Sequence, residues 1–155
     1  MFINTATLIR STFVAVTTTA LVAAATTAAH AEEFHGGSGV DRFEGGSEDD
    51  WVYGYGSGDA FGGNDGWDHL FGHVGNDTLW GDAGNDDLYG GAGRDNLQPG
   101  YGNDIVLGAR GADDVYIFAD GEPDLIKCGR GTDTVHYSDL DDNDVFRSCE
   151  EWDLL

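Results

Sequence analysis

An apolar residue recurs at every ninth position between Gly36 and Tyr116. When each nonapeptide is numbered from Gly36 as position one, position eight is apolar in all nine copies: Phe43, Val52, Phe61, Leu70, Leu79, Leu88, Leu97, Val106 and Val115. Positions seven and nine are polar or variable, and this alternation is typical of a strand with one inward side chain. Position one is glycine except at Pro99, and position four is glycine except at Glu48 and Ser57. Because glycine suits tight turns, each copy predicts a turn of about six residues and a strand of about three.

One copy is too short to close a circuit, whereas two consecutive copies form a flattened coil with two strands. Successive coils would stack their strands in parallel about 4.8 Å apart. The position-eight side chains would then fill a thin core between two sheets. The pattern therefore predicts an all-β parallel β-roll, a form of β-solenoid, over residues 36–116. Such a slim core does not offset the entropy of ordering many glycines, so the turns must add stabilisation.

Position six is aspartate in every copy: Asp41, Asp50, Asp59, Asp68, Asp77, Asp86, Asp95, Asp104 and Asp113. Stacking places each aspartate near the one two copies later, and like charges at this distance repel. A hard divalent cation reverses that repulsion. Calcium accepts six to eight oxygen ligands, from carboxylates and carbonyls alike, whereas zinc prefers nitrogen and sulfur. These nine aspartates are therefore the predicted metal ligands, with several Ca²⁺ ions as the cofactor.

The whole chain is strongly acidic, with a formal charge of −22. Nucleic-acid binding needs basic patches and is not expected. An acidic, glycine-rich chain tends toward disorder, so we expect folding to depend on bound cations. A merely solvating acidic surface would not explain why aspartate recurs at one phase of the repeat.

Residues 1–31 have a different composition. Arg10 precedes an uncharged run from Phe13 to Ala29, and Ala29-His30-Ala31 reads as a cleavage site. This pattern predicts a secretory signal peptide and a secreted, extracellular mature protein; a membrane anchor is the alternative. Export favours oxidation, so Cys128 and Cys149 are predicted to form a disulfide, with a free catalytic thiol as the alternative.

Gly81 to Leu88 (GDAGNDDL) and Gly90 to Leu97 (GGAGRDNL) resemble the RTX, or haemolysin-type, calcium-binding nonapeptide G-G-x-G-x-D-x-U-x. The resemblance covers residues 36–116 and implies a parallel β-roll with calcium between stacked turns. It implies side-chain ligands from the position-six aspartates and carbonyl ligands from neighbouring turn residues. The turns containing Glu48 and Ser57 depart from the motif, so we expect weaker or malformed sites there. Nine turns in two stacks allow at most seven sites between turns, and we expect four or more.

Residues 117–155 continue the pattern imperfectly. After a two-residue slip, Asp124 and Asp133 fall at position six of two degenerate copies. A C-terminal cap tied by Cys128–Cys149 is expected, because a solenoid end exposes unpaired edges. The segment from Asp139 to Glu150 resembles EF-hand spacing, but it lacks the glycine of that loop and flanking helices. An acidic loop is the alternative.

Position nine of the even-numbered copies holds Tyr53, Phe71, Tyr89 and Leu107, which would stack on one sheet face. Trp51, His69 and Ile105 would lie beside them at position seven. Such an apolar face can mark a contact surface for an envelope polysaccharide, a protein or a second copy; a covering cap, or the suitability of aromatics for strands, is the alternative. No catalytic motif is present, so the chain is not predicted to be an enzyme.

Overall fold

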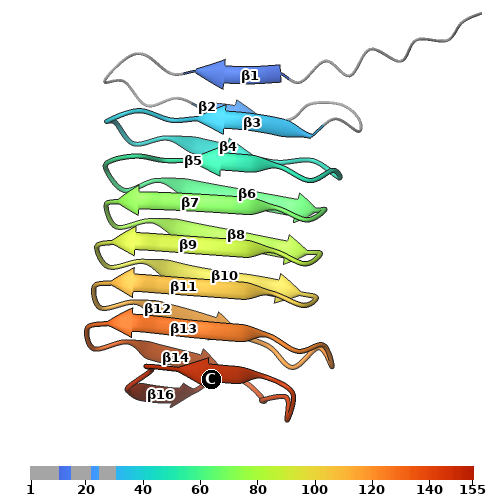
Figure 1. The fold of residues 1–155 in the computed structure, drawn as a ribbon, viewed down its shortest axis with the longest axis vertical. Helices are drawn as coiled ribbons and strands as arrows, with labels where there is room; N and C mark the ends of the chain where they lie inside the picture. Colours follow the sequence, from blue (N-terminus) through green and yellow to red (C-terminus); the bar gives the residue numbers. More distant parts are fainter. Residues whose placement is uncertain (1–10, 15–21, 25–30) are drawn as a thin grey trace, which may run out of the picture.

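The computed structural model describes residues 11–14, 22–24 and 31–155, and the described chain forms a parallel β-solenoid of about seven turns (Figure 1). Two eight-stranded sheets face each other, and consecutive strands alternate between them. Every strand pairing is parallel, so the all-β parallel fold expected from the nonapeptide pattern is confirmed. The described part of the chain contains no helix long and apolar enough to cross a membrane.

The strands of the first sheet are, in spatial order, β1 (Ser11–Val14), β3 (Glu32–His35), β5 (Trp51–Tyr53), β7 (His69–Val74), β9 (Asp87–Ala92), β11 (Ile105–Arg110), β13 (Leu125–Arg130) and β15 (Val145–Arg147). Those of the second sheet are β2 (Val22–Ala24), β4 (Arg42–Glu44), β6 (Ala60–Asp65), β8 (Thr78–Ala83), β10 (Asn96–Tyr101), β12 (Asp114–Ile117), β14 (Thr134–Tyr137) and β16 (Glu151–Leu154). Most of the predicted signal peptide, residues 1–31, lies outside the described residues; its described pieces, β1 and β2, pair with β3 and β4.

The core is a single file of apolar side chains between the two sheets. All nine position-eight residues are at most 1 % exposed, and Phe34, Ile126 and Val135 extend the file in both directions. In the central strands the residues on either side of position eight are half-buried or exposed, as period-two alternation requires. Core residues of neighbouring coils lie in register, as in Leu70↔Leu88 and Leu79↔Leu97.

The strands in the middle of the solenoid are longer than the three residues that we predicted. From β6 to β11 each has six residues, running from position seven to position three of the next copy. At position two, inside these longer strands, Asn64, His73, Asp82 and Ala109 adopt φ values of 74° to 79°; Tyr55 occupies the same position with a φ of 72°, although β5 ends at Tyr53. In the six-residue strands, positions two and three pair with the next coil, as in Asn64↔Asp82.

The regular spacing changes near the C-terminus. From β3 to β12, neighbouring strands are offset by two nonapeptides, as in Leu97↔Val115, but Ile105 of β11 pairs with Leu125 of β13, two positions further on. Pro99 lies in β10, and the pairing of β10 with β12 stops at Leu97, while β10 pairs with β8 as far as Tyr101. The missing N–H of proline and the longer turn after β12 account for this shorter ladder.

The predicted disulfide is present. Cys128 within β13 is bonded to Cys149 between β15 and β16, with their Cα atoms 5.1 Å apart. No free cysteine remains among the described residues, so the free-thiol alternative is wrong there. The disulfide joins the last coil to the coil before it.

Candidate metal centre

The position-six aspartates form two buried columns, one at each of the two turns of the coil. Each aspartate directly precedes a strand and follows a glycine-containing turn, so all of them occupy the same place in their coil. All nine are at most 2 % exposed. One column contains Asp41, Asp59, Asp77, Asp95 and Asp113, and the other contains Asp50, Asp68, Asp86 and Asp104.

Within a column, one carboxylate oxygen of each aspartate is used in a ladder between coils. The Oδ1 atom accepts a hydrogen bond from the backbone N–H of the aspartate one coil earlier: Asp68 N–H donates to Asp86 Oδ1 at 2.9 Å, and Asp86 N–H to Asp104 Oδ1 at 2.7 Å. The ladder satisfies an amide group that would otherwise be buried without a partner. It also fixes each carboxylate in one orientation.

In seven of the nine position-six aspartates the other oxygen, Oδ2, has no hydrogen-bond partner, whereas Oδ2 of Asp41 accepts from Gly37 N–H at 2.7 Å and Oδ2 of Asp50 from Gly46 N–H at 3.1 Å. Within the described residues, the buried side-chain oxygens without a hydrogen bond are the Oδ2 atoms of Asp59, Asp68, Asp77, Asp86, Asp95, Asp104, Asp113, Asp133 and Asp144. None of these carboxylates has an ion pair with a described basic side chain. A buried charged oxygen left without a partner costs several kcal/mol, roughly, so these oxygens call for a counter-charge.

The pKa values of these carboxyl groups also indicate the need for a positive counter-charge. Burial, reinforced by neighbouring carboxylates, raises the pKa of Asp68 to about 8 and that of Asp95 and Asp104 to about 7. The hydrogen bond from the backbone N–H acts in the opposite direction but does not cancel the burial. Without cations, the columns therefore retain protons near neutral pH.

The turns contribute carbonyl oxygens to the same region. A Cβ placed on Gly84 would lie 1.6 Å from Gly66 O, and one placed on Gly93 would lie 1.6 Å from Gly75 O. Stacked position-four residues thus approach so closely that only glycine fits, and their φ values of 144° and 146° favour glycine as well. The carbonyls of one coil are held against the next coil.

The available donors are oxygen atoms only, the set that a hard cation such as Ca²⁺ prefers. In the part of the chain that the structure describes, no three Asp, Glu, His or Cys side chains gather into a metal cluster. A cation in these columns would therefore be held by carboxylates of neighbouring coils together with turn carbonyls. The partnerless Oδ2 atoms and the glycine-only turns fit that arrangement.

The turns that depart from the motif also differ in structure. β4 and β5, which lead into the turns containing Glu48 and Ser57, stop after three residues, whereas the strands of the regular copies continue for six. Ser57 takes a φ of 83°, a conformation that glycine adopts more easily, and its hydroxyl donates to Ser38 O at 2.8 Å. The irregularity that we expected in these turns is present.

Sequence reasoning left three aspartates out of the ligand set. Asp124, Asp133 and Asp144 prolong the two columns, because Asp104 N–H, Asp113 N–H and Asp124 N–H donate to their respective Oδ1 atoms at 2.9–3.0 Å. Asp124 and Asp133 occupy position six of the degenerate copies, and this position was the sequence feature that could have identified them as ligands. Nothing in the sequence indicated that Oδ1 would bond to the backbone.

The segment that resembles an EF-hand loop takes part in the stacking instead. Asp141 Oδ2 accepts from Gly121 N–H at 2.7 Å, and Glu150 Oε2 accepts from Asp133 N–H at 3.3 Å. Asp141, Asp144 and Glu150 thus bond separately to the preceding coil. The acidic-loop alternative describes this segment better than an EF-hand.

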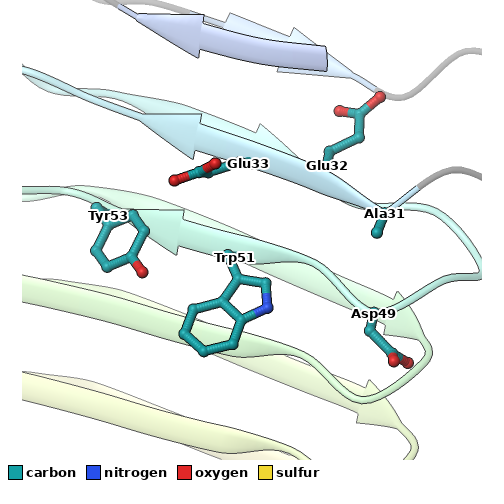
Figure 2. Close-up of a pocket in the computed structure, with 6 residues that line it drawn as sticks. All are labelled: Ala31, Glu32, Glu33, Asp49, Trp51 and Tyr53. Carbon is teal, nitrogen blue, oxygen red and sulfur yellow. The ribbon is translucent and has the colours of Figure 1, made fainter. Parts of the chain in front are cut away.

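The aromatic residues at position nine lie on the outer face of the first sheet, away from the columns. The rings of Tyr53 and Phe71 are 5.1 Å apart and nearly parallel, and Tyr89 continues the row at 6.0 Å. Trp51 and Tyr89 are each 43 % exposed, so no cap formed by the described residues covers these two side chains. A pocket of about 420 Å³ lies near its N-terminal end; Figure 2 shows Trp51 and Tyr53 of β5 with Glu33 of β3 in its lining. The lining meets a column at one point, where Glu32 N–H donates to Asp50 Oδ1 at 2.7 Å.

Comparison with known proteins gives one match. The model of a family described as RTX calcium-binding nonapeptide repeat (4 copies) matches residues 35–61, 62–97 and 100–115. A search of curated proteins and a search of solved structures found no match. The matched residues contain all nine of the aspartates that the periodicity singled out.

Proposed function

Since this chain belongs to the family of RTX calcium-binding nonapeptide repeats, we propose that it is a secreted calcium-binding protein whose β-roll folds when Ca²⁺ binds between stacked turns. The proposed ligands are the nine position-six aspartates, from Asp41 to Asp113, with turn carbonyls. The observation that supports this most directly is the row of buried Oδ2 atoms without a partner.

The residues of the chain prepare such sites in two ways. The backbone N–H bonds to Oδ1 orient each carboxylate, and the position-four glycines let turn carbonyls approach the next coil. Bound calcium would supply the positive charge that neutralises neighbouring carboxylates. Without that charge, the buried carboxylates disfavour the stacked state and the chain expands.

Secretion would determine where calcium-dependent folding takes place. The segment before Glu32 has the composition of a signal peptide, and extracellular calcium is roughly millimolar, enough to fill sites of modest affinity. We propose that the chain crosses the membrane unfolded and folds outside the cell. Since binding to the folded state alone shifts the equilibrium by mass action, calcium would act as the folding switch.

A calcium titration tests the proposal. Far-ultraviolet circular dichroism of the full chain in chelator should show little β-structure, and added Ca²⁺ at millimolar concentration should produce it. Calorimetry should give at least four ions per chain. Magnesium at the same concentration is the control, because its stricter octahedral geometry fits these turns less well. A β-rich spectrum that is unchanged by chelator would contradict folding on binding.

Neither the aromatic face nor a catalytic role has an observation comparable to the buried Oδ2 atoms that support calcium binding. The stacked rings of Tyr53 and Phe71 are a structural fact, but nothing in the fold or the family match favours an adhesive or envelope-binding role over calcium binding. The described part of the chain shows no catalytic motif, and we do not propose an enzymatic activity.

A further inference from the structure

The turn from Cys128 to Asp133 lies outside the residues that the family model matches, which end at 115. Its sequence, Cys-Gly-Arg-Gly-Thr-Asp, keeps glycine at positions two and four and aspartate at position six. Cys128 takes the place of the position-one glycine. The turn belongs to a longer coil, because Asp113 and Asp133 are separated by 20 positions, against 18 between Asp95 and Asp113.

In spite of this longer coil, the turn stacks as closely as the regular ones. Asp113 N–H donates to Asp133 Oδ1 at 2.9 Å, and Gly111 N–H donates to Arg130 O at 2.9 Å. A Cβ on Gly131, whose φ is 153°, would lie 1.3 Å from Gly111 O. The two extra residues are therefore absorbed in the opposite turn, after β12, and the alignment is regained here.

The level of the column where Asp113 and Asp133 stack, called the rung below, contains two buried oxygens without a hydrogen-bond partner. Asp113 is 1 % exposed and Asp133 is 0 % exposed, and the Oδ2 atom of each lacks a hydrogen bond. Arg110 and Arg130 lie side by side on the adjoining strands, but both side chains are exposed and neither has an ion pair with these carboxylates. The nearby arginines thus leave the buried charge uncompensated.

The rung is also closed on its C-terminal side. The Cys128–Cys149 disulfide holds the last coil against the turn, and Glu150 Oε2 accepts from Asp133 N–H at 3.3 Å. A carboxylate therefore follows Asp133 in the column, just as another aspartate follows in the regular coils. The covalent link keeps this arrangement in place.

We propose that Asp113 and Asp133, with the stacked turns around Gly111 and Gly131, hold a further divalent cation beyond the repeats that the family model matches. This inference rests on the proposed calcium-binding function, because it assigns the same oxygen chemistry to one more rung. It adds Asp133, which the nonapeptide motif does not assign, to the ligand set.

Counting bound ions tests the proposal. Native mass spectrometry of the full, oxidised chain in millimolar calcium should show one ion fewer in Asp133→Asn than in the unaltered protein. Asp142→Asn removes an exposed charge from the same region and should leave the count unchanged. An equal count in all three proteins overturns the inference. A chain that binds no calcium at all overturns the proposed function instead, so the two failures are distinguishable.

A second measurement covers the case in which Asp133→Asn does not fold. Hydrogen exchange of the unaltered protein should show calcium-dependent protection of the amides of residues 128–137, and magnesium should give none. Protection that is confined to residues before 118, or that is equal with and without calcium, overturns the inference.

Discussion

At the scale of single residues, each position-six aspartate has two oxygens with different roles. Oδ1 belongs to the ladder between coils, as in the 2.9 Å bond from Asp68 N–H to Asp86 Oδ1. From Asp59 to Asp113, Oδ2 is buried without a hydrogen-bond partner and is the proposed ligand. This division explains why asparagine would be an imperfect substitute: it can keep the first role but not the charge of the second.

Asp68→Asn should separate these roles. Because burial raises the pKa of Asp68 to about 8, removing its charge should stabilise the calcium-free coil at pH 7. The same change should raise the calcium midpoint of folding about tenfold, or about 1.4 kcal/mol, since a charged ligand is lost. Circular dichroism titrations measure both effects. Asp65→Asn, at an exposed position of the same copy, is the control and should change neither; a lower midpoint in Asp68→Asn would contradict the assignment.

The acidity of the columns predicts how stability depends on pH. The folded-state pKa values, about 6 for Asp86 and about 7 for Asp59 and Asp95, exceed the ordinary value of 3.8. Groups with raised pKa values favour the fold below about pH 4 and cease to do so as the pH rises through 6 to 8. In chelator, β-structure should therefore be retained in acid and lost toward pH 8, and calcium should prevent the loss. A fold that strengthens with pH in chelator would be inconsistent with these pKa values.

Position two offers a test of backbone strain. Ala109 has a φ of 79°, and an L-residue in this conformation is disfavoured by roughly 1–2 kcal/mol. Ala109→Gly should stabilise the calcium-bound fold by about 1 kcal/mol, after allowing for the entropy of glycine. Ala112→Gly, three residues on and not at positive φ, should be neutral or destabilising. Urea denaturation in calcium compares the free energies of unfolding of the two variants. Equal effects of the two changes would show that the backbone at Ala109 is not strained.

At the scale of strands and turns, the period of nine established most of the fold. The inward residues, the coil of two copies and the slip before Asp124 could be read from spacing alone, because a period of nine leaves one consistent phase for the core. The six-residue strands could not, since spacing does not show where the pairing between coils ends; the left-handed φ of Asn64 and His73 suits these residue types but does not set the strand length. The Oδ1 ladder was also missed, because spacing places a carboxylate in a turn but does not orient it.

The disulfide stabilises one coil by bonding it to its neighbour. It closes a loop with a sequence separation of 21 residues, and its loss should cost about 3 kcal/mol in the chain-entropy model. In calcium, Cys128→Ser/Cys149→Ser should make the segment after Tyr137 sensitive to protease while the earlier coils stay resistant. Mass spectrometry of the fragments locates the cuts. Cleavage spread evenly along the chain would show that the coils do not act separately.

At the scale of the whole molecule, the solenoid has little contact beyond neighbouring coils (Figure 1). The stability of such an array is approximately a sum over coils and their interfaces. Removing residues 72–89, one complete coil, should therefore give a folded protein that is less stable and binds fewer ions. Removing only residues 72–76 should destabilise the fold more than removing the complete coil, because it leaves one coil too short for its turns and strands to stack on both neighbours. Circular dichroism in calcium compares the two, and a shorter deletion that folds normally would refute the model.

The longer coil near the C-terminus also bears on how so repetitive a chain finds its correct alignment. The regular coils are so alike that a coil could pair with the one beyond its correct partner at little energetic cost. This mispairing would then shift every coil that follows. The C-terminal coils differ in length, because Ile105↔Leu125 and Leu125↔Val145 do not have the 18-residue offset of Leu97↔Val115, and the Cys128–Cys149 disulfide joins two of them covalently. Such coils fit in only one place. The C-terminal coils therefore fix the register in which the regular coils before them stack.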